Sequence, residues 1–220
     1  MNHMLICVAG TPGSGKTVIA EALFKKIRQE YPKKQFAIVH TDEVRARMRA
    51  EDKNKDNPII HTSFLEANKL SDAPGMAGYW EGWIKQSEAI MPEVAKEVKQ
   101  LLEQGKSVIC EGVAMIPPYG KYFPKGLEIM HFNINVGDSD TNKKRLQSRG
   151  RIGDRASASD LAKIKNIHIV QAFQDFLKTC SDALEDSDLF MQGLIAAAQT
   201  PISFQKTIKS NEAASYHKPL

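Results

Sequence analysis

The stretch that decides the fold is residues 10–17, which read Gly10-Thr11-Pro12-Gly13-Ser14-Gly15-Lys16-Thr17. It follows a short apolar run, residues 4–9, which predicts a buried parallel strand, and it precedes a helical pattern over residues 17–31. A glycine-rich turn of the form GxxxxGK[ST] between a strand and a helix is typical of a phosphate-binding P-loop. The glycines let backbone N–H groups converge on a phosphate, and the start of the helix adds partial positive charge.

The P-loop pattern predicts a separate task for each part of the loop. The backbone from Gly10 to Gly15 supplies N–H donors for the phosphates of ATP, and Lys16 reaches the β- and γ-phosphates. The hydroxyl of Thr17 is expected to ligate Mg²⁺. A chance match in a glycine-rich turn is the alternative, but every position of the pattern is filled and both flanks agree with it. We therefore expect ATP and Mg²⁺ as cofactors.

The composition fits a single globular domain, with or without a lid. The chain has 220 residues, an apolar fraction of 42% and a net charge of +4, which suits a small anionic substrate rather than nucleic acid. Neither a membrane-spanning apolar run nor a signal-peptide pattern is found, so we expect no membrane association. The cysteines Cys7, Cys110 and Cys180 are odd in number, which favours free thiols in a reducing compartment, the cytoplasm. The oligomeric state is left open.

Strand-like and helical patterns alternate along the whole chain. This alternation predicts an α/β fold of the P-loop NTPase type, with a five-stranded parallel sheet and helices on both faces. We expect one kinase domain over residues 1–200 and a loosely held polar tail over residues 201–220. The predicted strands are residues 4–9, 36–40, 107–110, 128–136 and 188–192.

Helical periodicity fills the stretches between the predicted strands. The longest pattern, residues 79–104, contains Pro92, which we expect to kink or divide the helix, and Gly105 is the expected C-cap. Asp42 is expected to cap the helix that follows the second strand. The predicted helices are residues 17–31, 43–50, 61–70, 79–104 and 158–184, with a further helix that has a basic end at residues 143–149.

Two carboxylates follow the ends of predicted strands, where parallel sheets bind their ligands. Asp42 comes after the second strand and could accept the proton of an acceptor hydroxyl or hold a Mg²⁺-bound water. A simple helix cap is the alternative for Asp42. Glu111 closes the third strand at a Walker-B-like position, where it could hold Mg²⁺ through water or bond a substrate hydroxyl. For Glu111 the alternative is a cap on the following turn.

Arg45 lies one helical turn beyond Asp42, on the same face of the predicted helix. A guanidinium binds phosphate or carboxylate through two parallel hydrogen bonds, so Arg45 is a candidate ligand for an anionic acceptor. Ordinary surface charge is the alternative. The neighbouring Arg47 and Arg49 are interpreted as part of a solvated face.

A second basic segment lies between two helical patterns near residue 150. Its spacing around two glycines predicts a lid, over about residues 145–157, that closes on the phosphates and stabilises the charge on the transferring group. Arg145 is expected to contact ATP, and Arg149 and Arg155 the transferring phosphate, although which arginine contacts which phosphate is left open. A basic, solvated helix end is the alternative. The arginines of the segment are Arg145, Arg149, Arg151 and Arg155.

Four stretches outside the P-loop resemble 2-phosphoglycerate kinase, within the nucleotide-kinase type of P-loop kinases. Residues 41–45 resemble the family's segment after strand two, and residues 60–67 its His-Thr-Ser-Ser-aromatic stretch. Residues 82–86 resemble its Gly-aromatic-x-x-Gln helix start, and residues 111–117 its Glu-Gly-Val-His-x-x-Pro-Gly signature. The resemblance implies ATP-dependent phosphorylation of 2-phosphoglycerate with Mg²⁺. It implies substrate contacts at these residues: Arg45, His61, Thr62, Ser63 and Glu111.

The sequence departs from the family's pattern at three positions. Ala114 stands where the signature has His, Pro118 where it has Gly, and Phe64 where a second Ser is usual. These departures leave open whether the acceptor is changed. Thr62 or Ser63 could also serve only as the cap of the helical pattern that follows.

Two other functions stay open at this point. A nucleoside or nucleotide kinase would share the fold and the lid, although no base-binding signature lies between the second and third predicted strands. A nucleotide-binding switch that acts through a protein partner is a different class, and it usually carries Asp where this chain has Glu111. A kinase needs a small acceptor to release ADP, whereas a switch hydrolyses ATP slowly and responds to a protein.

Overall fold

A computed structural model describes residues 3–116, 119–135, 139–148 and 208–209 of the chain. The chain forms two compact units. Unit 1 holds Met1–Ala9 and Lys16–Phe132, and unit 2 holds Gly10–Gly15 and Asn133–Leu220. The boundary falls inside the predicted P-loop, between its glycine-rich part and its lysine.

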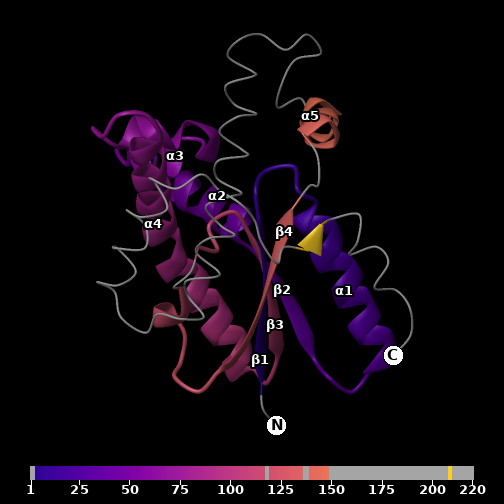
Figure 1. The fold of residues 1–220 in the computed structure, drawn as a ribbon. Helices are drawn as coiled ribbons and strands as arrows, with labels where there is room; N and C mark the ends of the chain where they lie inside the picture. The colour runs from indigo at the N-terminus through magenta and orange to yellow at the C-terminus, as the bar shows by residue number, and fades with distance from the viewer. Residues whose placement is uncertain (1–2, 117–118, 136–138, 149–207, 210–220) are drawn as a thin grey trace. The chain divides into compact units, whose positions relative to one another are not determined.

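Unit 1 is built on three parallel strands: β2 (Phe36–His40), β3 (Ser107–Gly112) and β1 (Met4–Gly10). The middle strand, β3, pairs with both neighbours, so that His40 faces Glu111 on one side and Ala9 faces Gly112 on the other. Every residue of β3 is buried, as expected for a parallel strand covered on both faces. Figure 1 shows α1 (Lys16–Glu30) on one side of these strands, and α2 (Thr41–Glu51) and α4 (Gly75–Glu103) on the other.

The long helix α4 is continuous through Pro92, so the predicted division of the helix at this residue is wrong. It ends in a Schellman motif. The N–H of Gly105 donates to the carbonyl of Leu102 at 2.9 Å, and that of Lys106 to Leu101 at 3.1 Å, with φ +80 at Gly105. The C-cap is Gln104, one residue before the predicted Gly105, and Gly105 is the glycine that follows the cap in this motif. The residues that α4 buries completely in the core include Trp83, Ile90, Met91, Val94 and Val98.

The predicted helix over residues 61–70 is wrong, because the structure has two short helices there. The first, α3 (Pro58–His61), begins earlier than predicted: proline is suited to a first helical position, and the Asn57 side chain accepts the N–H of Ile59 at 3.1 Å. The second is the 3₁₀-helix η1 (Phe64–Leu70). Two extended residues, Thr62 and Ser63, separate them.

The start of α2 also differs from the prediction. The helix begins at Thr41, and its N-cap is His40, which makes no side-chain capping bond. Asp42 therefore lies in the first turn and is not the cap. A carboxylate in the first turn still stabilises the helix, because it faces the positive end of the helix dipole.

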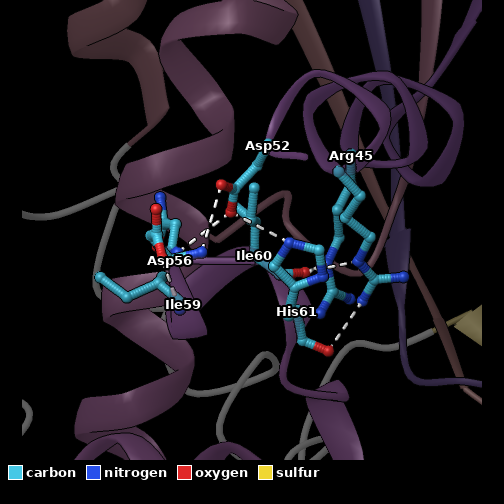
Figure 2. Close-up of polar contacts among 8 residues, drawn as sticks. Arg45, Asp52, Asp56, Ile59, Ile60 and His61 are labelled. Atoms are coloured by element: carbon cyan, nitrogen blue, oxygen red, sulfur yellow. Dashed lines mark hydrogen bonds and ion pairs between the residues drawn. The ribbon is translucent and has the colours of Figure 1, made fainter. Parts of the chain in front are cut away.

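The loop between α2 and α3 is closed by one carboxylate, that of Asp52 (Figure 2). Asp52 accepts the backbone N–H of Asp56 at 3.2 Å and that of Asn57 at 3.0 Å. The Nε2 atom of His61 lies 3.0 Å from the same carboxylate, and because an ionised carboxylate only accepts, Nε2 carries the proton. The bond from the Asn57 N–H is the main cause that lowers the pKa of Asp52, with smaller contributions from Asp56 and His61.

Unit 2 contains Gly10–Gly15, the end of β4 (Glu128–Asn135), α5 (Ser139–Ser148) and the two-residue strand β5 (Ile208–Lys209). β4 and β5 are parallel, with Ile134 opposite Ile208.

The α/β class with a parallel sheet is confirmed, and four of the five predicted strands match strands of the structure, β1 to β4. The predicted strand over residues 188–192 lies outside the described residues, and β5 lies instead in the predicted tail. The predicted helix over residues 158–184 is also outside them. Among the helices of the described residues, none combines the length and the apolar character needed to cross a membrane.

Gly82 on α4 tests how closely α4 and η1 approach each other. Alanine inside a helix is ordinarily favoured over glycine by about 1 kcal/mol. At Gly82 a Cβ would overlap the backbone oxygen of Ala67 on η1, so we expect Gly82→Ala to lower the free energy of unfolding by about 1–3 kcal/mol in urea titrations. Gly120→Ala is the control, because a Cβ there meets no atom within 4 Å. Equal effects at the two glycines would contradict the close approach.

Asp52 predicts an acid-dependent loss of stability. A carboxylate whose pKa is lowered by folding stabilises the folded state above its unfolded pKa, about 3.9, and loses that contribution as the pH falls through its folded pKa. We expect Asp52→Asn to reduce the fall in Tm on acidification below about pH 4. Asp56→Asn is the matched control, since Asp56 contributes only its backbone N–H to the loop. Identical Tm–pH curves for wild type and Asp52→Asn would exclude this role.

Candidate functional site

The glycine-rich part of the predicted P-loop has the backbone that a phosphate cradle needs. Gly13 and Gly15 have φ +82 and φ +96, values that side-chain-bearing residues rarely adopt. The N–H of Ser14 donates to the carbonyl of Thr11 at 3.1 Å, which closes the turn. The Ser14 hydroxyl is buried and has no partner in the part of the chain that the structure describes. The positive φ angles and the unpaired hydroxyl fit the phosphates of a nucleotide.

The carbonyl side of this loop is held by Arg145 of α5. Its Nη1 donates to the carbonyl of Ser14 at 3.1 Å and lies 3.5 Å from that of Gly13. A guanidinium on the carbonyl side stabilises a loop whose N–H groups point the other way. The structure thus places Arg145 on the loop backbone, and its contact with ATP stays a prediction.

Thr17, on the first turn of α1, is hydrogen-bonded to the carboxylate predicted at the end of β3. The Thr17 hydroxyl donates to Glu111 Oε1 at 3.2 Å, and Glu111 is only 5% exposed. His40 Nδ1, at the end of β2, lies 2.8 Å from the same oxygen. Of the three residues that the sequence assigned to Mg²⁺, the structure therefore brings together Thr17 and Glu111 but not Asp42, and it adds a histidine. Lys16, which precedes Thr17, is buried.

The donor set around Glu111 suits Mg²⁺ rather than a fully protein-bound metal. Within residues 3–116, 119–135 and 139–148, no three His, Cys, Asp or Glu side chains cluster so that they could hold an ion. Mg²⁺ prefers oxygen ligands and usually keeps several waters, with one or two carboxylates and the substrate phosphates as its other ligands. The Thr17 hydroxyl and the Glu111 carboxylate, which are hydrogen-bonded to each other, fit that chemistry.

Sequence reasoning missed three residues beside Glu111: His40, Thr41 and Gly112. Thr41 is buried, and its hydroxyl has no partner among the described residues. It lies against Gly112, where a Cβ would overlap the Thr41 side chain and where φ is +155. All three residues stand at strand ends, which is the criterion that selected Asp42 and Glu111, so the signal was present in the sequence.

Asp42 and Arg45 lie on α2 with different surroundings. Asp42 is exposed and has no hydrogen bond to any described residue, so its role as the base stays a prediction. Arg45 is 6% exposed, with its guanidinium 4.6 Å from the centre of the Phe64 ring. Burial, together with the positive charge of Arg49, lowers the pKa of Arg45 to about 10, and the charge of Asp42 opposes this shift.

The carbonyls of residues 59–62 accept hydrogen bonds from the long polar side chains of α2 and α4. Arg45 Nε donates to the carbonyl of Ile60 at 2.8 Å (Figure 2), and its Nη2 donates to that of Thr62. Gln86 of α4 donates to Thr62 at 2.6 Å and to Ile59 at 3.1 Å. These bonds fix the segment that carries His61, Thr62 and Ser63.

Three predicted acceptor-side residues follow one another in this fixed segment. His61 is bonded to Asp52, as described above, and Ser63 accepts the N–H of Leu65 at 3.3 Å as the N-cap of η1. The alternative that Ser63 acts as a cap is therefore confirmed. Substrate contacts at His61, Thr62 and Ser63 stay predictions.

The remaining predicted residues are placed as follows. Thr11 is buried and Pro12 half-buried within the loop. Ala114 is fully buried, and its carbonyl accepts the Ser87 hydroxyl at 2.6 Å. Arg149, Arg155 and Pro118 lie outside the described residues, and with them most of the predicted lid.

Comparison with known proteins gives distant relatives of one kind. No sequence model of a protein family matches the chain. A 2-phosphoglycerate kinase from Methanocaldococcus jannaschii is 24% identical over 172 residues, which are 77% of this chain and 53% of the relative. A 2-phosphoglycerate kinase from Methanococcus maripaludis is 21% identical over 183 residues, 80% of this chain and 56% of the relative. The chain thus spans about half the length of the curated relatives it matches.

Among solved structures, an unliganded sugar kinase from Janibacter sp. HTCC2649 covers 90% of this chain and 95% of its own, with 15% identity and a TM-score of 0.39. That TM-score is too low to support an inference. The names of the sequence relatives, in contrast, agree with the resemblance that residues 41–45, 60–67, 82–86 and 111–117 carry. The chain therefore resembles 2-phosphoglycerate kinase.

Proposed function

We propose that the chain is an ATP-dependent kinase of the P-loop type, which transfers the γ-phosphate to a hydroxyl of a small anionic metabolite. The name shared by its curated relatives supports 2-phosphoglycerate as the acceptor. The observation that carries the proposal is the bond between the Thr17 hydroxyl and the buried Glu111 carboxylate. A P-loop hydroxyl and a carboxylate at the end of a buried strand are the groups that hold the metal ion of a metal–nucleotide complex.

In this proposal each residue has a defined task. The loop backbone from Gly10 to Gly15 binds the phosphates, and Lys16 supplies a fixed positive charge. Mg²⁺, when bound, neutralises phosphate charge, and Thr17 and Glu111 hold it directly or through water. Because the transition state of phosphoryl transfer is loose, most of the catalysis is positioning and charge stabilisation.

The acceptor is held and oriented by residues of α2 and by the lid. Asp42 orients the acceptor hydroxyl or accepts its proton, and its exposure leaves it accessible to a substrate. Arg45 pairs with the acceptor's anionic group. Arg149 and Arg155 of the lid, at about residues 145–157, stabilise the transferring phosphate.

A reducing compartment, the cytoplasm, is part of the proposal. Cys7 of β1 and Cys110 of β3 are register partners, buried and free. Burial raises the pKa of the Cys7 thiol to about 12 and that of Cys110 well above its usual value. Two adjacent thiols kept protonated and apart are suited to a reducing environment.

The first test is ADP release from Mg-ATP by the full chain across a panel of acceptors. The panel contains 2-phosphoglycerate, 3-phosphoglycerate, nucleoside monophosphates and free sugars, with Lys16→Ala as the blank. We expect release with 2-phosphoglycerate. Release with another acceptor only would support a kinase and discard the named substrate, and release with nucleoside monophosphates would indicate a nucleotide kinase. Tight ATP binding without release on any acceptor would overturn the kinase in favour of a partner-controlled switch.

The substitution Glu111→Gln tests whether Glu111 belongs to the Mg²⁺ site. The amide keeps an oxygen for the Thr17 hydroxyl but loses the charge, so we expect the Mg²⁺ concentration for half-maximal ADP release to rise about tenfold to a hundredfold. Glu128→Gln, at the exposed start of β4, is the control for the loss of one carboxylate. An unchanged Mg²⁺ requirement in Glu111→Gln would remove Glu111 from the metal site.

A further inference from the structure

Two arginines of α2 donate to the same backbone oxygen. Arg45 and Arg49 stand four residues apart, and their Nε atoms lie 2.8 Å and 2.6 Å from the carbonyl oxygen of Ile60. The Nη2 atoms donate to neighbouring carbonyls, that of Arg45 to Thr62 and that of Arg49 to His61 at 3.4 Å. Figure 2 shows the Arg45 side of this arrangement, beside Ile60 and His61. Two positive charges are thus held beside one short segment.

In the described part of the chain, no ion pair neutralises these two charges. Backbone carbonyls orient a guanidinium, but they carry no net charge. No carboxylate of the described residues lies within ion-pair distance of Arg45 or Arg49. Burial is the main cause that lowers the pKa of Arg45, the positive charge of Arg49 adds to it, and the charge of Asp42 opposes it. Arg45 is buried and Arg49 half-buried, and charges without an ion-pair partner are costly to remove from water unless an anion joins them.

The third arginine of α2, Arg47, is an exposed surface residue with an ion-pair partner. Arg47 lies between the other two in sequence, but its side chain is 53% exposed and pairs with Glu97 of α4. Among the described residues, the same helix therefore carries one ion-paired surface arginine and two inward arginines that form no ion pair. Because helical spacing puts positions 45 and 49 on one face and position 47 on another, the difference follows from the geometry of α2.

We propose that Arg45 and Arg49 together bind the doubly charged group of a phosphomonoester acceptor, and that Arg49 is the residue that makes the site specific for two charges. The inference deepens the proposed function and rests on it. A guanidinium has five N–H donors, and the bonds above use only Nε and Nη2 of each arginine. The Nη1 groups of both arginines make no hydrogen bond to a described residue, so they are available to phosphate oxygens. A single arginine would suffice for a carboxylate.

The surroundings hold both guanidiniums in place before an anion binds. The Phe64 ring packs against Arg45, and Gln86 shares the Thr62 carbonyl with it. Asp52 fixes His61, the residue whose carbonyl Arg49 contacts. An anion site built on side chains that are already ordered loses little entropy on binding.

The test compares Arg49→Gln and Arg49→Lys with Arg47→Gln, all in the full chain carrying Lys16→Ala, which weakens competing anion binding at the P-loop. Titration calorimetry measures the Kd for inorganic phosphate and for 2-phosphoglycerate without nucleotide. We expect Arg49→Gln to raise both Kd values by about tenfold or more, because a hydrogen-bonded charge is lost. Arg49→Lys keeps the charge but loses the planar set of donors, so its Kd values should lie between those of the parent and of Arg49→Gln. Arg47→Gln should stay within about twofold of the parent.

Several outcomes would overturn the inference: a parent chain that binds neither probe, an Arg49→Gln chain that binds both like the parent, or an Arg49→Lys chain as weak as Arg49→Gln. The last result would mean that Arg49 only holds the segment. Failure of the proposed function is separate. Arg49-dependent phosphate binding without ADP release on any acceptor would leave this site intact and discard the kinase. In chains that keep Lys16, ADP release whose acceptor KM is unchanged in Arg49→Gln would do the reverse.

Discussion

The buried carboxylate of Glu111 is the constraint on which the strand ends of unit 1 depend. β3 is the middle of the three strands, and Glu111, which is only 5% exposed, takes its hydrogen bonds from neighbouring elements. Thr17 supplies one bond from α1 and His40 another from β2. A carboxylate whose hydrogen-bond partners come from separate elements holds those elements in place relative to one another, here at the end of β3.

A second constraint acts through neutral oxygens rather than charge. The carbonyls of residues 59–62 belong to a helix of only four residues and to the turn after it, so they lack the partners that a longer helix would provide. Arg45, Arg49 and Gln86 supply the missing donors. The segment with the predicted acceptor residues is therefore rigid because its backbone bonds are made by long side chains from two other helices.

Most of the elements of unit 1 could be predicted from the sequence, because their signals are local. The apolar run at residues 36–40 matches β2, and Gly105 ends α4 by the motif that its freedom of φ allows. The segment after α2 could not be predicted in the same way. Its apolar residues fit a helical period, but the Pro58 start and the extended Thr62 divide it into α3 and η1, and side chains from α2 and α4 stabilise the result.

The residues of the candidate site differ in the same way: some could be predicted from local patterns and others could not. The predicted P-loop and Glu111 follow from patterns of adjacent residues, whereas the difference between Arg47 and Arg49 does not. Both are arginines in a charged stretch, and the sequence favours a solvated face for each. What separates them is the direction of the helix face, which brings Arg49 to the carbonyl of Ile60 and Arg47 to Glu97. A charge becomes a binding group when its neighbours orient it without neutralising it, and that condition is visible only in three dimensions.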